Sequence, residues 1–199
     1  CDHIIVNYKQ SKFSKNKVIG TYRLLKQQVA EQKIGFYSSE EYNLDKLINS
    51  NQYTNMLELS RSCISERFRN KNVLQLMWRE INHYINTNKI DAMFGTASFL
   101  ETNIKKINNQ LLFLQQNYKM PENIEVKALK NFRAKIDYSQ KVQLSFKLMK
   151  SLPTLIKGYV KLYAYIGDGA VVDHKFKTTD VFVFLPVDRI NKEYVSKII

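Results

Sequence analysis

Apolar residues recur along this chain with two different periods, and their alternation predicts a mixed α/β fold. Residues 3–8 and 18–25 predict two strands of a hairpin, joined by a polar segment rich in Lys, Ser and Asn. Residues 56–64 predict a strand, 71–88 a helix with one apolar face, and 92–100 an apolar strand. If the outer two strands are parallel, this unit requires a right-handed crossover, which would form the centre of the fold.

The second half of the chain predicts further helices and a closing pair of strands. Thr102 or Asn103 is placed to cap an amphipathic helix that ends before Pro121, and the Lys-rich segment 119–151 reads as an insertion with short helices. A helix is expected from about 152 to 165, with Tyr163 inward and the glycines at 167 and 169 ending it. Residues 171–176 and 180–187 predict the closing strands, joined at 177–179. Residues 36–55 lack a strong period and predict a loop with one or two helical turns.

Length and composition favour one globular domain over residues 1–199. The chain has 44% hydrophobic residues, 3 Pro and 6 Gly, which is typical of a packed core with regular elements. Its apolar runs are too short for a membrane helix, so membrane contact is expected to be peripheral. Cys1 and Cys63 lie far apart without a metal-ligand cluster, which predicts neither a disulfide nor a metal site and favours the reducing cytoplasm. Because Cys1 leads at once into a strand, we expect the chain to begin inside a domain.

The formal net charge of +13 favours an acidic partner. Nucleic acid, anionic lipid headgroups and an acidic carrier protein all meet this condition, and so does a solvated lysine-rich surface without any polyanion. A basic nucleic-acid-binding module is therefore one alternative for the function. The sequence has no RNA-binding aromatic motif, zinc finger or helix-turn-helix signature to support it.

Charged residues inside predicted strands are the first candidates for chemistry, because burying them is costly unless they are paired or used. Glu58 and Arg61 lie in the strand at 56–64, and Arg23 lies in the strand at 18–25. Residues three apart on a regular strand face opposite sides, so Glu58 and Arg61 share a site only if a β-bulge separates them. A structural ion pair is the alternative reading of these three residues.

The segment after that strand is basic and opens a helix. Free backbone N–H groups at a helix start favour phosphate, and this segment offers Arg67, Arg69, Lys71 and Asn72 there. It has no glycine, so close approach of the backbone to a phosphate is not assured, and a solvated helix start is the other interpretation.

A third polar group borders the closing strands. It consists of Asp173, His174 and Asp180. Asp173 and His174 are neighbours on a strand and are expected to point to opposite faces, so only one of them should face a given site. Cys63 has no nearby histidine that would mark it as a nucleophile.

Seven blocks in the same order resemble one family over nearly the whole chain. They are residues 1–3 (CDH), 19–25 (IGTYRLL), 58–64 (ELSRSCI), 76–81 (LMWREI), 94–99 (FGTASF), 155–159 (LIKGY) and 167–181 (GDGAVVDHKFKTTDV). Together they are similar to the ornithine-acyl-ACP N-acyltransferases, often called hemolysin-like, of the Gcn5-related N-acetyltransferase (GNAT) fold. The resemblance implies a mixed central sheet flanked by helices, a helical insertion around 102–151, and N-terminal elements missing before Cys1.

The resemblance also implies the reaction and its partners. A 3-hydroxyacyl group would pass from acyl-carrier protein to the α-amine of L-ornithine, by direct attack and without a tightly bound cofactor. Glu58 would accept the proton of the amine, directly or through water, and Arg23 or Arg61 would hold its carboxylate. Asp2, Asp173 or Asp180 would hold the side-chain ammonium, with His174 lining the site.

For the donor, the basic segment at 67–72 would meet the phosphopantetheine phosphate or the carrier protein, since the glycines of a CoA-binding loop are absent. An anionic membrane face is a second candidate partner, and no nucleic acid is expected. Two related functions remain as alternatives: that of an enzyme resembling acyl-homoserine lactone synthases, and that of an N-acyltransferase for another amino acid.

Overall fold

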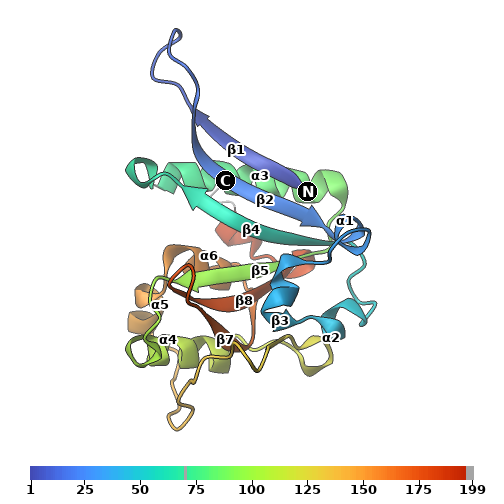
Figure 1. Cartoon of the computed structure of the whole chain (residues 1–199), viewed down its shortest axis with the longest axis vertical. Coiled ribbons are helices and arrows are strands. Elements are labelled where there is room, and N and C mark those ends of the chain that lie inside the picture. Colours follow the sequence, from blue (N-terminus) through green and yellow to red (C-terminus); the bar gives the residue numbers. More distant parts are fainter. Residues whose placement is uncertain (70, 196–199) are drawn as a thin grey trace.

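The computed structural model describes residues 1–69 and 71–195. These residues form an eight-stranded sheet in the order β1-β2-β4-β5-β8-β7-β6-β3, with helices packed on it (Figure 1). The strands are β1 (Asp2–Tyr8), β2 (Lys17–Lys26), β3 (Tyr42–Asn43), β4 (Met56–Ile64), β5 (Ala92–Phe99), β6 (Lys127–Ala128), β7 (Tyr165–Asp173) and β8 (Thr178–Pro186). The α-helices are α1 (Gln27–Glu31), α2 (Asp45–Ile48), α3 (Lys71–Asn88), α4 (Ile104–Asn117), α5 (Phe146–Ser151), α6 (Thr154–Lys161) and α7 (Lys192–Val195). The 3-10 helices are η1 (Tyr37–Glu40), η2 (Glu66–Phe68), η3 (Glu122–Ile124) and η4 (Val187–Arg189).

The first half of the chain folds as its apolar pattern predicts. The hairpin β1–β2 and the strand, helix and strand β4, α3 and β5 all form at the predicted residues. Strands β4 and β5 are parallel neighbours, which confirms the predicted unit. Helix α4 begins after Asn103, whose side chain accepts a hydrogen bond from the Lys105 N–H and caps the helix.

Strands β4 and β5 separate soon after they pair. Their pairing runs from Met56 with Ala92 to Glu58 with Phe94, and the strands then diverge (Figure 1). Gly95 follows the last pair, where an added Cβ would overlap the carbonyl oxygen of Leu59. Only glycine allows so close an approach of the two backbones.

Two apolar cores lie on opposite faces of the sheet. One core packs the sheet against α3, α4 and α6, through side chains such as Met77, Leu111 and Ile156. The other packs it beneath α1, α2 and the segment around η1, through side chains such as Phe36 and Leu47. Because side chains alternate along a strand, neighbouring residues of one strand contribute to different cores.

The predicted end of the helix near 165 was wrong. Helix α6 ends at Lys161, and Tyr163 is 52% exposed with a φ of 69°, so it does not face the core. Gly167 and Gly169 lie within β7 instead of ending the helix. Gly169 has a φ of 83°, and the pairing of β7 with β8 shifts between Ile166 and Ala170. Glycines that mark an irregular strand therefore resembled a helix stop in the sequence.

The closing strands and the insertion also differ from their predicted bounds. Strand β7 starts at Tyr165 and β8 at Thr178, so residues 174–177 form the turn that was expected at 177–179. The insertion around 102–151 does contain α4, η3 and α5 as predicted. The two-residue strands β3 and β6 were not predicted, and they extend the sheet beyond β7. Among the described residues, no helix has the length and apolar character needed to cross a membrane.

Candidate active site

A β-bulge in β4 sets the geometry of the candidate site. Strand β4 pairs with β2 through Ser60 with Arg23 and then through Cys63 with Thr21, so one residue of β2 faces two residues of β4. Arg61, one of those two residues, has a φ of 53°. This is the interruption that the sequence required if Glu58 and Arg61 were to share a face of the sheet.

Glu58 anchors the η1 turn. Its side chain is fully buried, at 0% exposure, and its two oxygens accept three hydrogen bonds. The Tyr37 N–H donates to Oε2 at 3.0 Å, while the Ser38 N–H and Oγ donate to Oε1 at 2.7 Å each. Three donors aimed at one carboxylate fix the position of the turn and of the Tyr37 ring beside it.

Two arginines lie close to the Tyr37 ring. The guanidinium carbon of Arg61 is 4.7 Å from the ring centroid, and that of Arg23 is 5.3 Å from it. Arg23 also donates from Nε to Ser60 Oγ at 2.8 Å, but its Nη2 is buried without a hydrogen-bond partner. Arg61 approaches the ring of Phe176 at 5.6 Å. Arg23 and Arg61 together form what we call the cationic wall, whose unused N–H donors are suited to a carboxylate.

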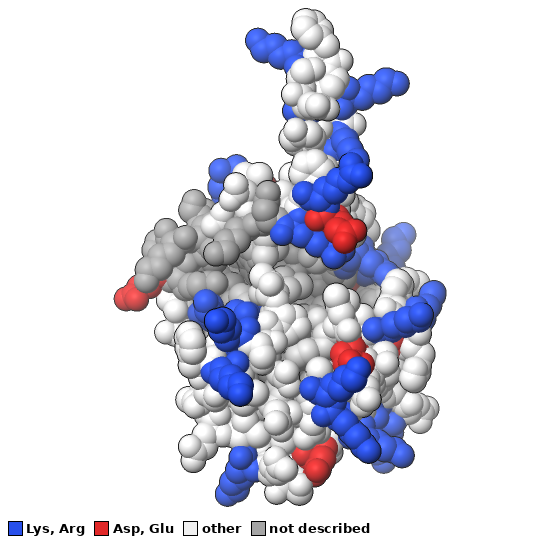
Figure 2. Space-filling view, turned by 90° about the vertical axis from the view of Figure 1, so that its left-hand side faces the viewer, with Lys and Arg blue, Asp and Glu red and all other residues white. Residues whose placement is uncertain are grey.

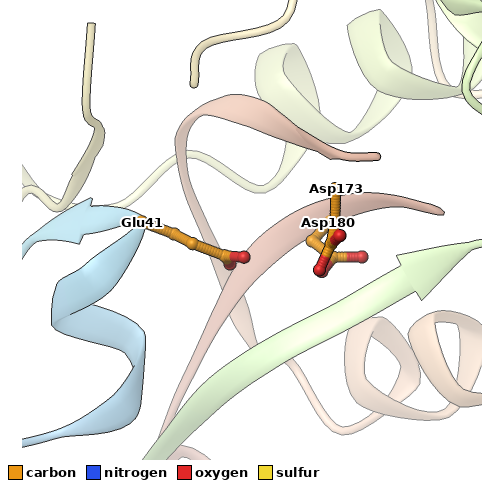
Figure 3. Close-up of side chains that lie close together, drawn as sticks. All are labelled: Glu41, Asp173 and Asp180. Atoms are coloured by element: carbon orange, nitrogen blue, oxygen red, sulfur yellow. The ribbon is translucent and has the colours of Figure 1, made fainter. Parts of the chain in front are cut away.

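Three carboxylates from distant parts of the sequence meet nearby. Glu41, Asp173 and Asp180 each place a carboxylate oxygen within 4.8 Å of the others. Figure 3 shows Glu41 extending from the start of β3 toward Asp173 and Asp180, which lie at the adjoining ends of β7 and β8. Asp180 is 7% exposed, and its Oδ1 has no hydrogen-bond partner, nor does Oε2 of Glu41. We call these three residues the acidic group.

Burial and mutual repulsion perturb two members of the acidic group. Burial raises the pKa of Glu41 to about 7, and the charges of Asp180, Asp173 and Glu40 act in the same direction. Burial also raises the pKa of Asp180, against hydrogen bonds from Ser98 and Thr178 that lower it. Carboxylates this close resist carrying full charge until a cation joins them.

The cationic wall and the acidic group share one region without neutralising each other. Burial raises the pKa of Tyr37; the charge of Arg61 lowers it, and the charges of Glu41 and Asp173 raise it, so both kinds of charge act on this one side chain. Neither Arg23 nor Arg61 forms an ion pair with any carboxylate described by the structure. An arrangement of unpaired opposite charges is suited to a small dipolar ligand with a carboxylate at one end and an ammonium at the other.

Comparison with known proteins points to the same chemistry. Residues 1–79 match the model of the acetyltransferase (GNAT) domain. An L-ornithine N(alpha)-acyltransferase of Brucella abortus is 38% identical over 198 residues, which cover 98% of this chain and 70% of that protein. The chain belongs to the L-ornithine N(alpha)-acyltransferase family.

Other members also match over nearly the whole chain. An L-ornithine N(alpha)-acyltransferase of Rhizobium meliloti is 36% identical over 98% of this chain and 67% of its own length. One of Rhodobacter capsulatus is 29% identical over 97% of this chain and 74% of its own length. No solved structure matches the chain. The family, the GNAT fold and the class of acyltransferase enzymes expected from the sequence are therefore confirmed.

Two residues expected to line the site lie elsewhere. Asp2 accepts a hydrogen bond from the Tyr84 hydroxyl of α3 at 2.5 Å, and it pairs with Leu24, the neighbour of Arg23 on β2. Adjacent residues of a strand face opposite sides, so the structure does not bring Asp2 to the acidic group. His174 lines a pocket of about 330 Å³ together with Val172. Of the neighbours Asp173 and His174, only Asp173 belongs to the acidic group. The predicted opposite orientation of Asp173 and His174 agrees with this arrangement.

The basic segment expected to meet the donor surrounds the start of α3. Arg67 lies in η2 and is exposed, and Arg69 is held by a hydrogen bond from Nε to the carbonyl oxygen of Ile64. Lys71 begins α3, but its side chain lies outside the described residues, as does Asn70. Asn72 is exposed on the first turn. The segment follows directly on the bulged strand β4.

Glu41 and Tyr37 were not among the residues predicted for the site. Both lie in the segment 36–55, whose irregular pattern predicts only a loop with helical turns. The pair Glu40 and Glu41 shows that the loop is acidic, but only contact with Asp180 distinguishes Glu41 from its exposed neighbour. That contact is a property of the folded chain.

Proposed function

We propose that the protein transfers an acyl group from a thioester to the α-amine of L-ornithine, as the name of its curated relatives describes. This would be the first step of ornithine-lipid synthesis. The observation that carries the proposal is the cationic wall of Arg23 and Arg61 beside Tyr37, with the acidic group close to the same side chain, in a chain 38% identical to such an enzyme. An acyltransferase whose site contains charges of both signs is suited to an amino acid as the acyl acceptor.

In the proposed reaction, the neutral α-amine attacks the thioester carbonyl directly. A nitrogen–carbon bond forms, the carbon–sulfur bond breaks, and the thiol leaves with a proton after the α-ammonium has lost its own proton to solvent. Arg23 and Arg61 hold the carboxylate of the amino acid, which fixes the amine for attack. Backbone N–H groups of β4, where it departs from β5, would polarise the thioester carbonyl. No covalent acyl-enzyme is needed.

We assign Glu58 to positioning within this scheme. Its sequence context predicts a proton acceptor, yet both of its oxygens accept hydrogen bonds from the η1 turn. These bonds occupy three of its roughly four acceptor positions, and the fully buried side chain presents no surface at which a reacting amine could approach it. Glu58 instead holds Tyr37 beside the two arginines, so it acts on the substrate through that ring.

We further propose acyl-carrier protein as the donor, carrying a 3-hydroxyacyl group. Arg67, Arg69, Lys71 and Asn72 surround the start of α3 and lack the glycines of a CoA-binding loop. A carrier protein presents an acidic surface and a phosphopantetheine phosphate to such a segment. The face in Figure 2 carries many more Lys and Arg than Asp and Glu side chains, which favours an acidic partner.

The hairpin β1–β2 suits contact with an anionic membrane, where the lipid product would collect. Its connection at residues 9–16 projects from the body of the molecule (Figure 1) and carries Lys9, Lys12 and Lys15 around Phe13, which is 99% exposed. Lysines attract anionic headgroups, and an exposed aromatic ring enters the interface.

The experiment that tests the function supplies the full-length protein with L-ornithine and either 3-hydroxyacyl-carrier protein or the matching acyl-CoA. Mass spectrometry should detect Nα-acyl-ornithine, formed faster from the carrier protein. Arg61→Ala should raise the KM for ornithine by about 10–100-fold through loss of a charge-assisted contact. No acylated amino acid from either donor would refute the function, and an equal rate from both would refute the choice of donor alone.

A further inference from the structure

The reaction of the relatives requires a choice between two amines of one substrate. Their name specifies acylation at the α-nitrogen, while ornithine carries a second amine at the end of its side chain. We propose that the acidic group binds this side-chain ammonium, and that it thereby selects a diamino acid and decides which amine is acylated. The inference rests on the proposed function and assigns a task to three residues, of which Glu41 had no predicted role.

The geometry of the acidic group suits an ammonium ion. An ammonium that donates three hydrogen bonds of about 2.8 Å in tetrahedral directions holds its acceptors about 4.6 Å apart. Carboxylate oxygens of Glu41, Asp173 and Asp180 lie within 4.8 Å of one another. Each residue therefore offers one acceptor to a single cation placed between them.

The acceptors of the acidic group are available. Oδ1 of Asp180 belongs to a side chain that is 7% exposed, and it has no hydrogen-bond partner. Oε2 of Glu41 is likewise buried and unpartnered. Asp173 uses only Oδ1, which accepts from the N–H groups of Lys175 and Phe176 in the turn. Buried carboxylate oxygens without donors are costly, and a bound ammonium would remove that cost.

The surroundings favour a dipolar organic ligand over a metal ion. Arg61 lies against Phe176, which follows Asp173 by three residues, so the guanidinium and the acidic group border the same space. A divalent cation in the acidic group would meet about twice the repulsion from this arginine that a singly charged ammonium meets, and it would leave the arginine without an anion. An amino acid instead places its carboxylate at Arg23 and Arg61, its methylene chain along Tyr37, and its terminal ammonium at the acidic group.

Binding in this orientation explains the choice of amine. Three carboxylates favour the protonated form of the side-chain amine, and a protonated amine has no lone pair with which to attack a thioester. The α-amine lies near the arginines, outside the acidic group, and is free to lose its proton. Regiochemistry thus follows from the electrostatics of the site.

The test compares L-ornithine with L-norvaline, which has the same carbon chain but no terminal amine. For the full-length protein we expect kcat/KM for ornithine to exceed that for norvaline by about 10–100-fold, the value of a charge-assisted hydrogen bond. Asp180→Asn and Glu41→Gln should each lower this ratio at least tenfold. Fragmentation of the products by tandem mass spectrometry should reveal Nδ-acyl-ornithine from the variants but not from the parent. Glu40→Gln, an exposed neighbour in the same segment, is the matched control and should keep both the ratio and the isomer.

The possible results separate the inference from the function on which it rests. The inference would be overturned if Asp180→Asn and Glu41→Gln lowered kcat/KM for ornithine and for norvaline by the same factor and left the product isomer unchanged. Equal use of ornithine and norvaline by the parent protein would overturn it while amino-acid acylation stands. Loss of activity in EDTA that Mg²⁺ or Mn²⁺ restores would assign the acidic group to a metal ion instead. No acylation of either amino acid would refute the proposed function itself.

Discussion

Replacing Glu58 by glutamine distinguishes a positioning carboxylate from a catalytic base. Glutamine preserves the size of the side chain and one acceptor oxygen, but its NH₂ would face a donor that now bonds to the carboxylate, such as the Tyr37 N–H. The loss of one hydrogen bond to a charged acceptor costs about 1.5–3 kcal/mol, and two buried donors facing each other cost about 1–3 kcal/mol more. Since removal of the buried charge recovers part of this, we expect the free energy of unfolding to fall by about 2–4 kcal/mol.

The effect is measurable by denaturant unfolding and thermal melts followed by circular dichroism. A loss of 2–4 kcal/mol corresponds to a fall in Tm of about 5–15 °C for a domain of this size. Ser38→Ala, which removes only the Oγ donor to Glu58, should lower stability in the same direction by about 1–2 kcal/mol. Both variants should retain the shape of the pH–rate profile, with a higher KM for ornithine, since Tyr37 and the arginines move but no proton acceptor is lost.

The opposite result would refute this reasoning. If Glu58→Gln unfolds at the parental temperature while kcat falls by about 100-fold or more, the carboxylate is the base and not an anchor of the η1 turn. A change in the acidic limb of the pH–rate profile would support that conclusion independently.

Further variants test other parts of the structure. The pKa of Glu41 is raised to about 7 from 4.5, so the folded state binds a proton that the unfolded state has already released. The carboxyl group therefore destabilises the fold increasingly as pH rises from 4.5 to 7. In urea unfolding, Glu41→Gln should raise the free energy of unfolding by about 1–2 kcal/mol at pH 8, after allowance for partial exposure, but by little at pH 4. A gain in stability independent of pH would contradict this. Gly95→Ala should lower the free energy of unfolding by about 3 kcal/mol, because the added Cβ meets the Leu59 carbonyl. Gly158→Ala in α6 has open space around the added Cβ and should raise the free energy of unfolding by about 0.5–1 kcal/mol. Equal effects of the two substitutions would show that β4 and β5 can move apart at no cost. Cys63→Ala should acylate at the parental rate in a mass-spectrometric assay, because Cys63 is exposed on β4 and direct attack needs no thiol; a rate reduced 100-fold would indicate an acyl-enzyme.

The sequence was a reliable guide wherever local pattern decides structure. Period-two and helical apolar patterns located β1, β2, β4, α3 and β5, because a half-buried strand or helix must show its buried face in its sequence. Glycine was ambiguous, since Gly167 and Gly169 serve an irregular strand and not a helix end. The short strands β3 and β6 have too few residues to carry a period.

For the candidate site, the sequence by itself determined the residue types and the family, and the tertiary structure decided their partners. The spacing of Glu58 and Arg61 showed that a shared face required a bulge, and the fold supplied it through the left-handed backbone of Arg61. The sequence did not show which carboxylates come together. Glu41 lies far from Asp173 and Asp180 in the chain and joins them only when β3 packs beside the other strands. Long-range packing leaves no periodic trace in any one segment, so electrostatic contacts between segments are visible only in the folded protein.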